Sequence, residues 1–207
     1  MKFCLSIASL FGLLASLVFY APASAESDSD CLRGIELGNA LIEKSPSGFR
    51  GYASRGCGYA HFRQYDLAET DFLKAIELKP DMAGLYCNLS STYYETRRYK
   101  DALSAIRKAI ELGDRSEATQ NAELSLLCLS MNYSECLRRA DEVIKLFPAD
   151  ATAYYYRAVC NSELNQSSRR GVLSDLARAN SLAPADKAIK CDYELFKSGK
   201  KLEPKNR

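Results

Sequence analysis

Apolar and aromatic positions in this chain recur with a period of 34 residues. A repeat of this length is typical of stacked pairs of helices, each of which buries its apolar face on its neighbours. The pattern therefore predicts an all-α fold built from consecutive helix pairs. The positions that share a phase are Tyr52, Tyr86 and Tyr154; Tyr59 and Tyr93; Tyr65, Tyr99 and Tyr133; Ala68 and Ala102; Ala75 and Ala109; and Leu78, Leu112 and Leu146.

The period divides most of the chain into four units, at residues 49–82, 83–116, 117–150 and 151–186. In the last unit Leu176, Ala179 and Leu182 return at an offset of 36 residues, which places an insertion in the polar turn 165–170. We expect a single capping helix within 26–48. A second amphipathic helix and a basic tail should occupy 187–207, because terminal helices cover the apolar seam at each end of such an array.

The first unit carries the most complete motif, Tyr52-x-x-Arg55-Gly56-x-x-Tyr59 followed by Ala68-x-x-x-Phe72, Ala75 and Pro80. This spacing resembles the tetratricopeptide repeat, with Arg55 where that family prefers leucine. The resemblance covers roughly residues 49–186. It implies an all-α, right-handed superhelix of antiparallel helix pairs, with about four repeats between the two capping helices.

The resemblance also implies a binding surface. In the family, the first helix of each pair lines a concave groove that holds a peptide or protein segment. The side chains carried over to that groove are mostly small and neutral, and the carboxylate clamp of the co-chaperones is absent apart from Asn88. We expect the partner to be held by the candidate binding residues Asn88, Asn121, Tyr94, Tyr155, Tyr156 and His61.

These candidates have different expected roles. The amides of Asn88 and Asn121 can each donate to and accept from a peptide bond. Tyr155 and Tyr156 follow Tyr154 and cannot share its buried face, so we expect both to be exposed. His61 is the only histidine, and such a residue is more often a satisfied polar side chain than a ligand.

The N-terminus has the features of a secretory signal peptide, which assigns residues 1–25 to a removed leader. Lys2 precedes an apolar stretch, and Ala23-Ser24-Ala25 has the small residues that signal peptidase requires. An uncleaved membrane anchor is the alternative, because the apolar stretch is nearly long enough to span a bilayer. We expect export to the bacterial periplasm or secretion, with no membrane span after cleavage.

Seven cysteines follow that leader, which in an exported protein indicates disulfides with one thiol left over. The C-x7-C pair Cys128 and Cys136 resembles pairs in helical cysteine-rich repeat proteins. Successive helices could also bring together Cys57 with Cys87, and Cys160 with Cys191, leaving Cys31 free to join two chains as a homodimer. A Cys128–Cys160 bridge is the competing arrangement.

Composition and motifs argue against several other functions. Without Lys2 the chain carries 27 basic and 26 acidic residues, so nucleic acid is not expected as a partner. Neither C-x2-C nor a second histidine is present, and no metal or other cofactor is expected. A Cys57–His61 dyad, one helical turn apart, is the single catalytic arrangement the sequence offers, and Cys57 is better explained by a bridge.

The sequence therefore predicts a non-catalytic exported scaffold that binds a protein or peptide partner in its concave groove. The alternative is a structural adaptor that oligomerises through its convex face, its terminal helices or Cys31.

Overall fold

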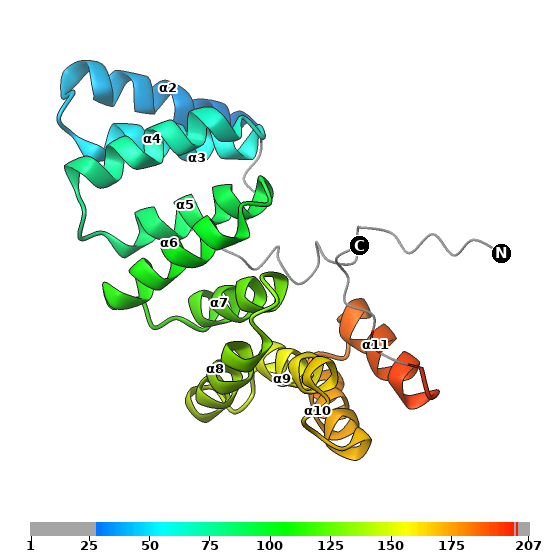
Figure 1. Ribbon diagram of the computed structural model, residues 1–207. Coiled ribbons are helices and arrows are strands. Elements are labelled where there is room, and N and C mark those ends of the chain that lie inside the picture. The colour runs from blue at the N-terminus through cyan, green and yellow to red at the C-terminus, as the bar shows by residue number, and fades with distance from the viewer. Residues whose placement is uncertain (1–27, 201, 203–207) are drawn as a thin grey trace. The chain divides into compact units, whose positions relative to one another are not determined.

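The computed structural model describes residues 28–200 and 202, and every regular element within them is an α-helix (Figure 1). The all-α prediction is confirmed. The proposed leader lies outside the described residues. The helices are α2 Asp28–Lys44, α3 Phe49–His61, α4 Tyr65–Leu78, α5 Ala83–Glu95, α6 Tyr99–Glu111, α7 Glu117–Leu129, α8 Tyr133–Leu146, α9 Ala151–Leu164, α10 Arg169–Leu182 and α11 Lys187–Lys197.

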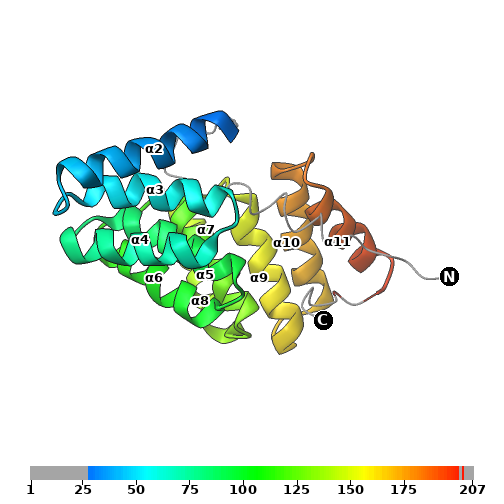
Figure 2. The same cartoon turned by 90° about the horizontal axis from the view of Figure 1, so that it is seen from above.

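The described chain divides into an N-terminal unit, residues 28–119, and a C-terminal unit, residues 120–202. Within the N-terminal unit α3 packs between α2 and α4, and α5 packs between α4 and α6. Within the C-terminal unit α9 packs between α8 and α10, and α11 packs on α10 (Figure 2). Each predicted unit of 34 residues thus holds one helix pair.

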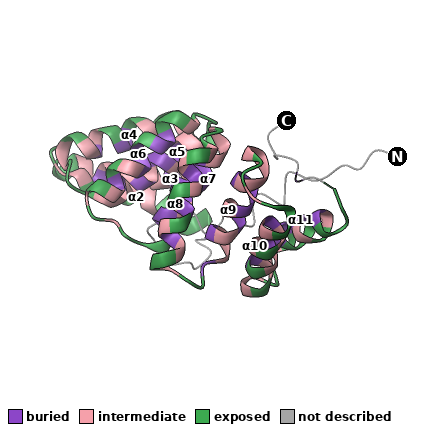
Figure 3. Cartoon of the chain, turned by 60° about the horizontal axis from the view of Figure 1, so that its bottom comes forward, coloured by how far each residue is buried: buried purple, intermediate pink, exposed green. Residues whose placement is uncertain are grey.

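Small and aromatic residues of the repeat motif pack together where neighbouring helices of the N-terminal unit meet. Ala68 and Phe72 on α4 are fully buried and pack with Leu89 of α5, and Tyr59 and Tyr93 border this cluster. The buried residues form stripes along the inner sides of the helices (Figure 3). The resulting contact is the core of the N-terminal unit, and it depends on the spacing of the motif.

The repeated tyrosines also join each helix pair to the turn before it. The hydroxyl groups of Tyr52, Tyr86 and Tyr154 donate hydrogen bonds to the carbonyl oxygens of Pro46, Pro80 and Pro148, at 3.2, 3.0 and 3.4 Å. Each tyrosine lies six residues after its proline. The third unit has Gln120 and Asp114 at these two positions, so it lacks both partners of the bond.

The turn inside each pair has a residue with a left-handed backbone at the same point of the repeat. These residues are Arg63, Arg97, Met131 and Asn165, with φ of 58°, 60°, 59° and 51°. The two inserted residues of the last unit are divided between its first helix and its turn. The helix α9 has 14 residues where α3, α5 and α7 have 13, and its turn is one residue longer.

A charged pair joins the two helices in three of the four units. Arg55 donates two hydrogen bonds of 2.8 Å to Asp71, and Arg157 donates two of 2.9 and 2.7 Å to Asp175. In the third unit the signs are reversed, because Arg139 on the second helix bonds Glu123 on the first at 2.9 Å.

Candidate functional site

The candidate site in the N-terminal unit lies on α3 and α5, the first helices of two successive pairs. Asn88 on α5 donates from Nδ2 to Sγ of Cys57 on α3 at 3.5 Å, and both side chains are half-buried. Their contact shows that these two positions face the same side of the unit. Ser91, one turn further along α5, is also half-buried.

Tyr94 lies at the end of α5, two turns after Asn88. Its ring centre is 5.8 Å from that of Tyr99, the first residue of α6, and the side chain is half-buried. Burial, followed by the neighbouring Tyr99 and Glu95, raises the pKa of Tyr94 to about 12. The phenol is therefore neutral at physiological pH and can both donate and accept a hydrogen bond.

His61 is held by the helix that precedes the first pair. Its Nε2 lies 3.0 Å from Oδ1 of Asp28 at the start of α2. Ser54, on the same helix as His61, donates to the carbonyl oxygen of Gly34 in α2 at 3.0 Å. The side chain of His61 is thus directed to α2, while Cys57 is directed to Asn88, which gives the suggested Cys–His dyad no support.

In the C-terminal unit Asn121 and Tyr156 are half-buried. Asn121 lies near Asp150, whose carboxylate caps α9 by accepting from Thr152 N at 2.8 Å. Burial is the largest influence on Asp150 and raises its pKa. The Oδ1 atom of Asn121 is buried without a hydrogen-bond partner among the described residues.

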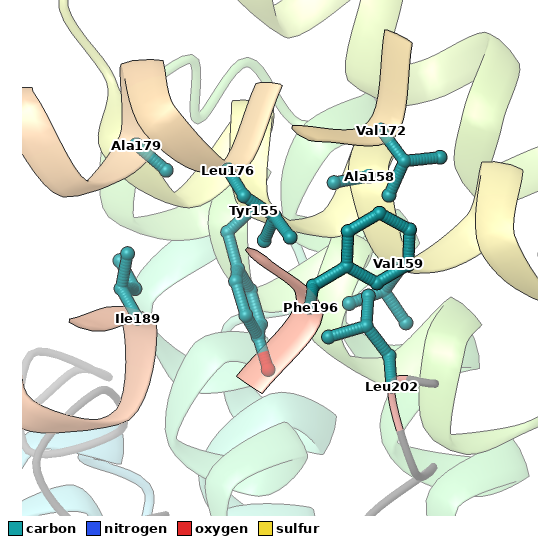
Figure 4. Close-up of a cluster of buried hydrophobic side chains, with 9 residues drawn as sticks. All are labelled: Tyr155, Ala158, Val159, Val172, Leu176, Ala179, Ile189, Phe196 and Leu202. Carbon is teal, nitrogen blue, oxygen red and sulfur yellow. The ribbon is translucent and has the colours of Figure 1, made fainter. Parts of the chain in front are cut away.

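Tyr155 is not exposed, contrary to the prediction. Its side chain is 7% exposed and lies in the core of the C-terminal unit with Leu176, Ile189 and Phe196 (Figure 4). Its hydroxyl donates to Oδ2 of Asp192 at 2.7 Å. Tyr155 is buried because α11 covers this face of α9, whereas Tyr154 is only half-buried. Tyr156 packs beside Tyr155, with ring centres 5.4 Å apart.

All seven described cysteines are free thiols, so the proposed bridges stay predictions. Cys87 is buried and contacts Asp114 and Thr119 through sulfur at 3.5 and 3.9 Å. Burial, with the Asp114 charge next, raises its pKa to about 12. Cys160 is fully buried whereas Cys191 is exposed.

Cys31 is 4% exposed, contrary to its proposed role as an accessible thiol. Its backbone carbonyl packs against Gly58 of α3, where an added Cβ would come within 2.9 Å. A bond to a second chain through Cys31 would therefore require α2 to move away from α3.

The described residues contain no group of three or more histidine, cysteine or acidic side chains that could hold a metal ion. Among the helices of residues 28–200, none has the length and apolar character needed to cross a membrane.

A polar cleft of about 390 Å³ lies elsewhere in the C-terminal unit, between α8, α9 and α10. Arg157, Asp141 and Asp175 line it and satisfy one another, since Arg157 bonds Asp141 at 2.8 Å in addition to Asp175. This internal pairing leaves the cleft without an evident charge for a ligand.

A family model described as the tetratricopeptide repeat matches residues 49–82 and 83–112. The match begins at Phe49 and Ala83, the first residues of α3 and α5. The helix pairs α3–α4 and α5–α6 are therefore tetratricopeptide repeats. The matched segments contain Cys57, Asn88, Ser91 and Tyr94, so the candidate site of the N-terminal unit lies wholly within recognised repeats.

Solved structures of other proteins share the fold. One is YrrB, described as a TPR protein with an unusual peptide-binding site, with a TM-score of 0.66 and 18% identity over 80% of this chain and 84% of that one. Another is MamA, with a TM-score of 0.68 and 14% identity over 77% of this chain and 92% of that one. Identities this low establish the architecture alone.

One curated relative is the UDP-N-acetylglucosamine–peptide N-acetylglucosaminyltransferase of Giardia intestinalis (strain ATCC 50803 / WB clone C6). It is 33% identical over 63 residues, which are 30% of this chain and 4% of the enzyme. The chain thus spans only a small part of the enzyme's length, and the likeness carries no activity with it.

The register of the repeat extends beyond the four pairs, which the sequence analysis missed. Arg55 bonds Asn39 of α2 at 2.9 Å in the same way that Arg157 bonds Asp141 of α8. Asn39 and Asp141 are three periods of 34 residues apart. The helix α2 therefore has the register of a second helix of a tetratricopeptide repeat, and Pro46 after it matches Pro80 and Pro148.

Proposed function

We propose that this protein is an exported, non-catalytic scaffold that binds a peptide or an extended protein segment. The binding surface is the Asn88 face, made of Cys57, Asn88, Ser91 and Tyr94 on α3 and α5. Tetratricopeptide repeats generally bind protein partners, and the face lies on the first helices of two recognised repeats.

The observation that carries the proposal is the bond between Asn88 and Cys57. A thiol sulfur is a weak acceptor, so the amide donor of Asn88 gives up little when a better acceptor replaces it. A peptide carbonyl oxygen is such an acceptor, and the carbonyl of the same amide can accept from a peptide N–H. Asn88 can therefore recognise the backbone of a ligand.

The rest of the face suits a ligand without a strong charge. Tyr94 is a neutral phenol with a half-buried ring, and such side chains provide large contact area at low conformational cost. Ser91 and Cys57 are small and uncharged. The description of YrrB as a peptide-binding protein gives the same fold a ligand of this class.

An exported protein would meet its partner outside the cytosol. The inference of export rests on the sequence of the first 25 residues, with Ala23-Ser24-Ala25 as the cleavage site. These residues lie outside the described part of the chain. The seven cysteines after that site suit an oxidising compartment, in which disulfides form and persist.

The proposal is tested with peptides selected by the wild-type protein from a random library displayed on phage. Their affinities are then measured for the variants Asn88→Ala and Tyr94→Ala by fluorescence anisotropy. We expect Asn88→Ala to weaken binding by roughly tenfold, because a pair of backbone hydrogen bonds is lost. Tyr94→Ala should weaken it by about 30-fold or more if the ring is a central contact.

The matched control is Lys100→Ala, which alters an exposed residue of α6 outside the Asn88 face. Its affinities should equal those of the wild type. Unchanged affinities in both Asn88→Ala and Tyr94→Ala, with folding verified by circular dichroism, would place the binding site elsewhere.

A further inference from the structure

Three cysteines of the C-terminal unit form a cluster although they come from three different helices. Cys128 lies near the end of α7, Cys136 in the first turn of α8 and Cys160 in α9. Cys128 packs against the core cluster to which Ala158 and Val159, the neighbours of Cys160 on α9, belong. Cys128 and Cys136 are both near enough to Cys160 to change its pKa. Cys136 additionally directs its thiol to the carbonyl oxygen of Leu124 at 3.5 Å.

The three thiols differ in their access to solvent. Cys136 and Cys160 are 0% exposed, whereas Cys128 is half-buried. An external reagent can therefore reach Cys128 first, and Cys160 is the thiol that adjoins it. Cys191, the partner that the sequence argument gave to Cys160, is exposed on α11 and has no place in this cluster.

We propose that Cys128 and Cys160 form a disulfide-forming dithiol site that oxidised glutathione, or another small disulfide, converts to a bridge between α7 and α9. The proposal is independent of the Asn88 face. It selects the Cys128–Cys160 pairing over the Cys128–Cys136 and Cys160–Cys191 pairings expected from the sequence.

The reaction is two successive thiol–disulfide exchanges. The Cys128 thiolate attacks one sulfur of oxidised glutathione, which forms a mixed disulfide and releases one glutathione. The Cys160 thiolate then attacks the Cys128 sulfur, which forms the protein disulfide and releases the second glutathione. The two protein thiols lose two electrons, the glutathione disulfide gains them, and the two thiol protons end on the two glutathione molecules.

The protonation state of the two thiols determines how fast the bridge forms. The neighbouring Cys160 and burial raise the pKa of Cys128. Cys128 lowers the pKa of Cys160, but Cys136 and burial outweigh it, so the pKa of Cys160 is raised as well. Both thiols are therefore mostly protonated at neutral pH, so the bridge should form over minutes to hours.

The experiment uses the full folded chain, reduced and then exposed to oxidised glutathione under native conditions. Unreacted thiols are blocked and the protein is cleaved without reduction by trypsin together with a glutamate-specific protease. Cleavage after Glu135 separates Cys128, in 124–135, from Cys136, in 136–138, and Cys160 is recovered in 158–163. Mass spectrometry should find 124–135 linked to 158–163 as the major product.

Two variants test the order of the steps. Cys160→Ser should accumulate glutathione on Cys128, and Cys128→Ser should lower the rate of intramolecular bridge formation at least tenfold. Cys191→Ser is the matched control and should react like the wild type. The oxidised wild type should also melt about 10 °C above the reduced form, since the bridge closes a long loop.

The wild-type map decides the matter even if a serine variant does not fold. A major Cys128–Cys136, Cys136–Cys160 or Cys160–Cys191 product, or the absence of any intramolecular bridge, would overturn the proposal.

Discussion

Arg55 stands where the tetratricopeptide repeat prefers leucine, and the structure gives the reason. The position recurs as Arg55, Leu89, Glu123 and Arg157, and the facing position on the second helix recurs as Asp71, Ala105, Arg139 and Asp175. The two positions have changed together: the second unit has a buried leucine and a buried alanine there, and opposite charges pair in the other three units. The contact therefore tolerates either an apolar or an ionic pair.

A double-mutant cycle tests whether an apolar pair can replace the Arg55–Asp71 ion pair. Arg55→Leu alone should lower the free energy of unfolding by about 3 kcal/mol, because Asp71 is 4% exposed and would lose its partner. Adding Asp71→Ala reproduces the Leu89–Ala105 pair and should recover most of that loss. Urea denaturation followed by circular dichroism measures all three variants.

The control for this cycle is the exposed ion pair between Lys74 and Glu77 on the same helix pair. Lys74→Met should leave stability unchanged within error, because exposed pairs contribute little. A double variant no more stable than Arg55→Leu would contradict the interpretation of the two positions as interchangeable.

At the scale of elements, the contact between α2 and α3 depends on glycine. A Cβ added to Gly58 would lie 2.4 Å from Cγ1 of Ile35 and 2.9 Å from the carbonyl oxygen of Cys31. A Cβ added to Gly38 would lie 2.7 Å from Cβ of Arg55 and 2.8 Å from the carbonyl oxygen of Gly51. Backbone lies against backbone here, so neither helix can yield by a simple change of rotamer.

Gly58→Ala is accordingly expected to destabilise the protein by about 1–2 kcal/mol, since overpacking outweighs the better helix propensity of alanine. Gly84→Ala is the matched control, because a Cβ there meets nothing within 4 Å. Gly84 also lies in a helix, so its replacement should stabilise by about 0.5–1 kcal/mol. Chemical denaturation of both variants gives the comparison, and equal effects would mean that α2 does not pack as described.

The sequence predicted these elements well because period and spacing are local properties. The four helix pairs, the displaced last unit and the two flanking helices follow from aromatic, alanine and proline positions alone. The environment of Tyr155 could not be predicted in this way, because it depends on which helix covers α9 at the end of the chain. Asn88 and Tyr94 were placed on the first helices correctly, whereas the bond from His61 to Asp28 depends on the packing of α2, which the motif does not encode.

Across the described residues, the repeat extends by half a pair on either side of the four pairs. The helix α2 has the register of a second helix. The helix α11 has that of a first helix, because Asp186 caps it as Asp150 caps α9, with bonds of 2.8 Å to Ala188 N and Thr152 N. Both helices that flank the four described pairs are therefore of the repeat type. In an array of this kind each helix is stabilised mainly by its immediate neighbours.

The packing of α11 in the core of the C-terminal unit gives a prediction for the molecule as a whole. Phe196 on α11 is 6% exposed and packs with Tyr155, Val159 and Leu202, while the guanidinium of Arg169 lies 4.5 Å from its ring centre (Figure 4). Phe196→Ala should cost about 3–5 kcal/mol by opening a cavity in this core. The loss should stay in the C-terminal unit, because stability in a repeat array is a sum over neighbouring contacts.

Hydrogen exchange followed by mass spectrometry measures this directly. Protection of backbone amides should fall in α9, α10 and α11 of Phe196→Ala and stay at the wild-type level in α3, α4 and α5. Leu146→Ala, at a residue 61% exposed at the end of α8, is the control and should change neither region. An equal loss of protection in both units would show that the chain unfolds as one cooperative body and that stability is not a sum of neighbouring contacts.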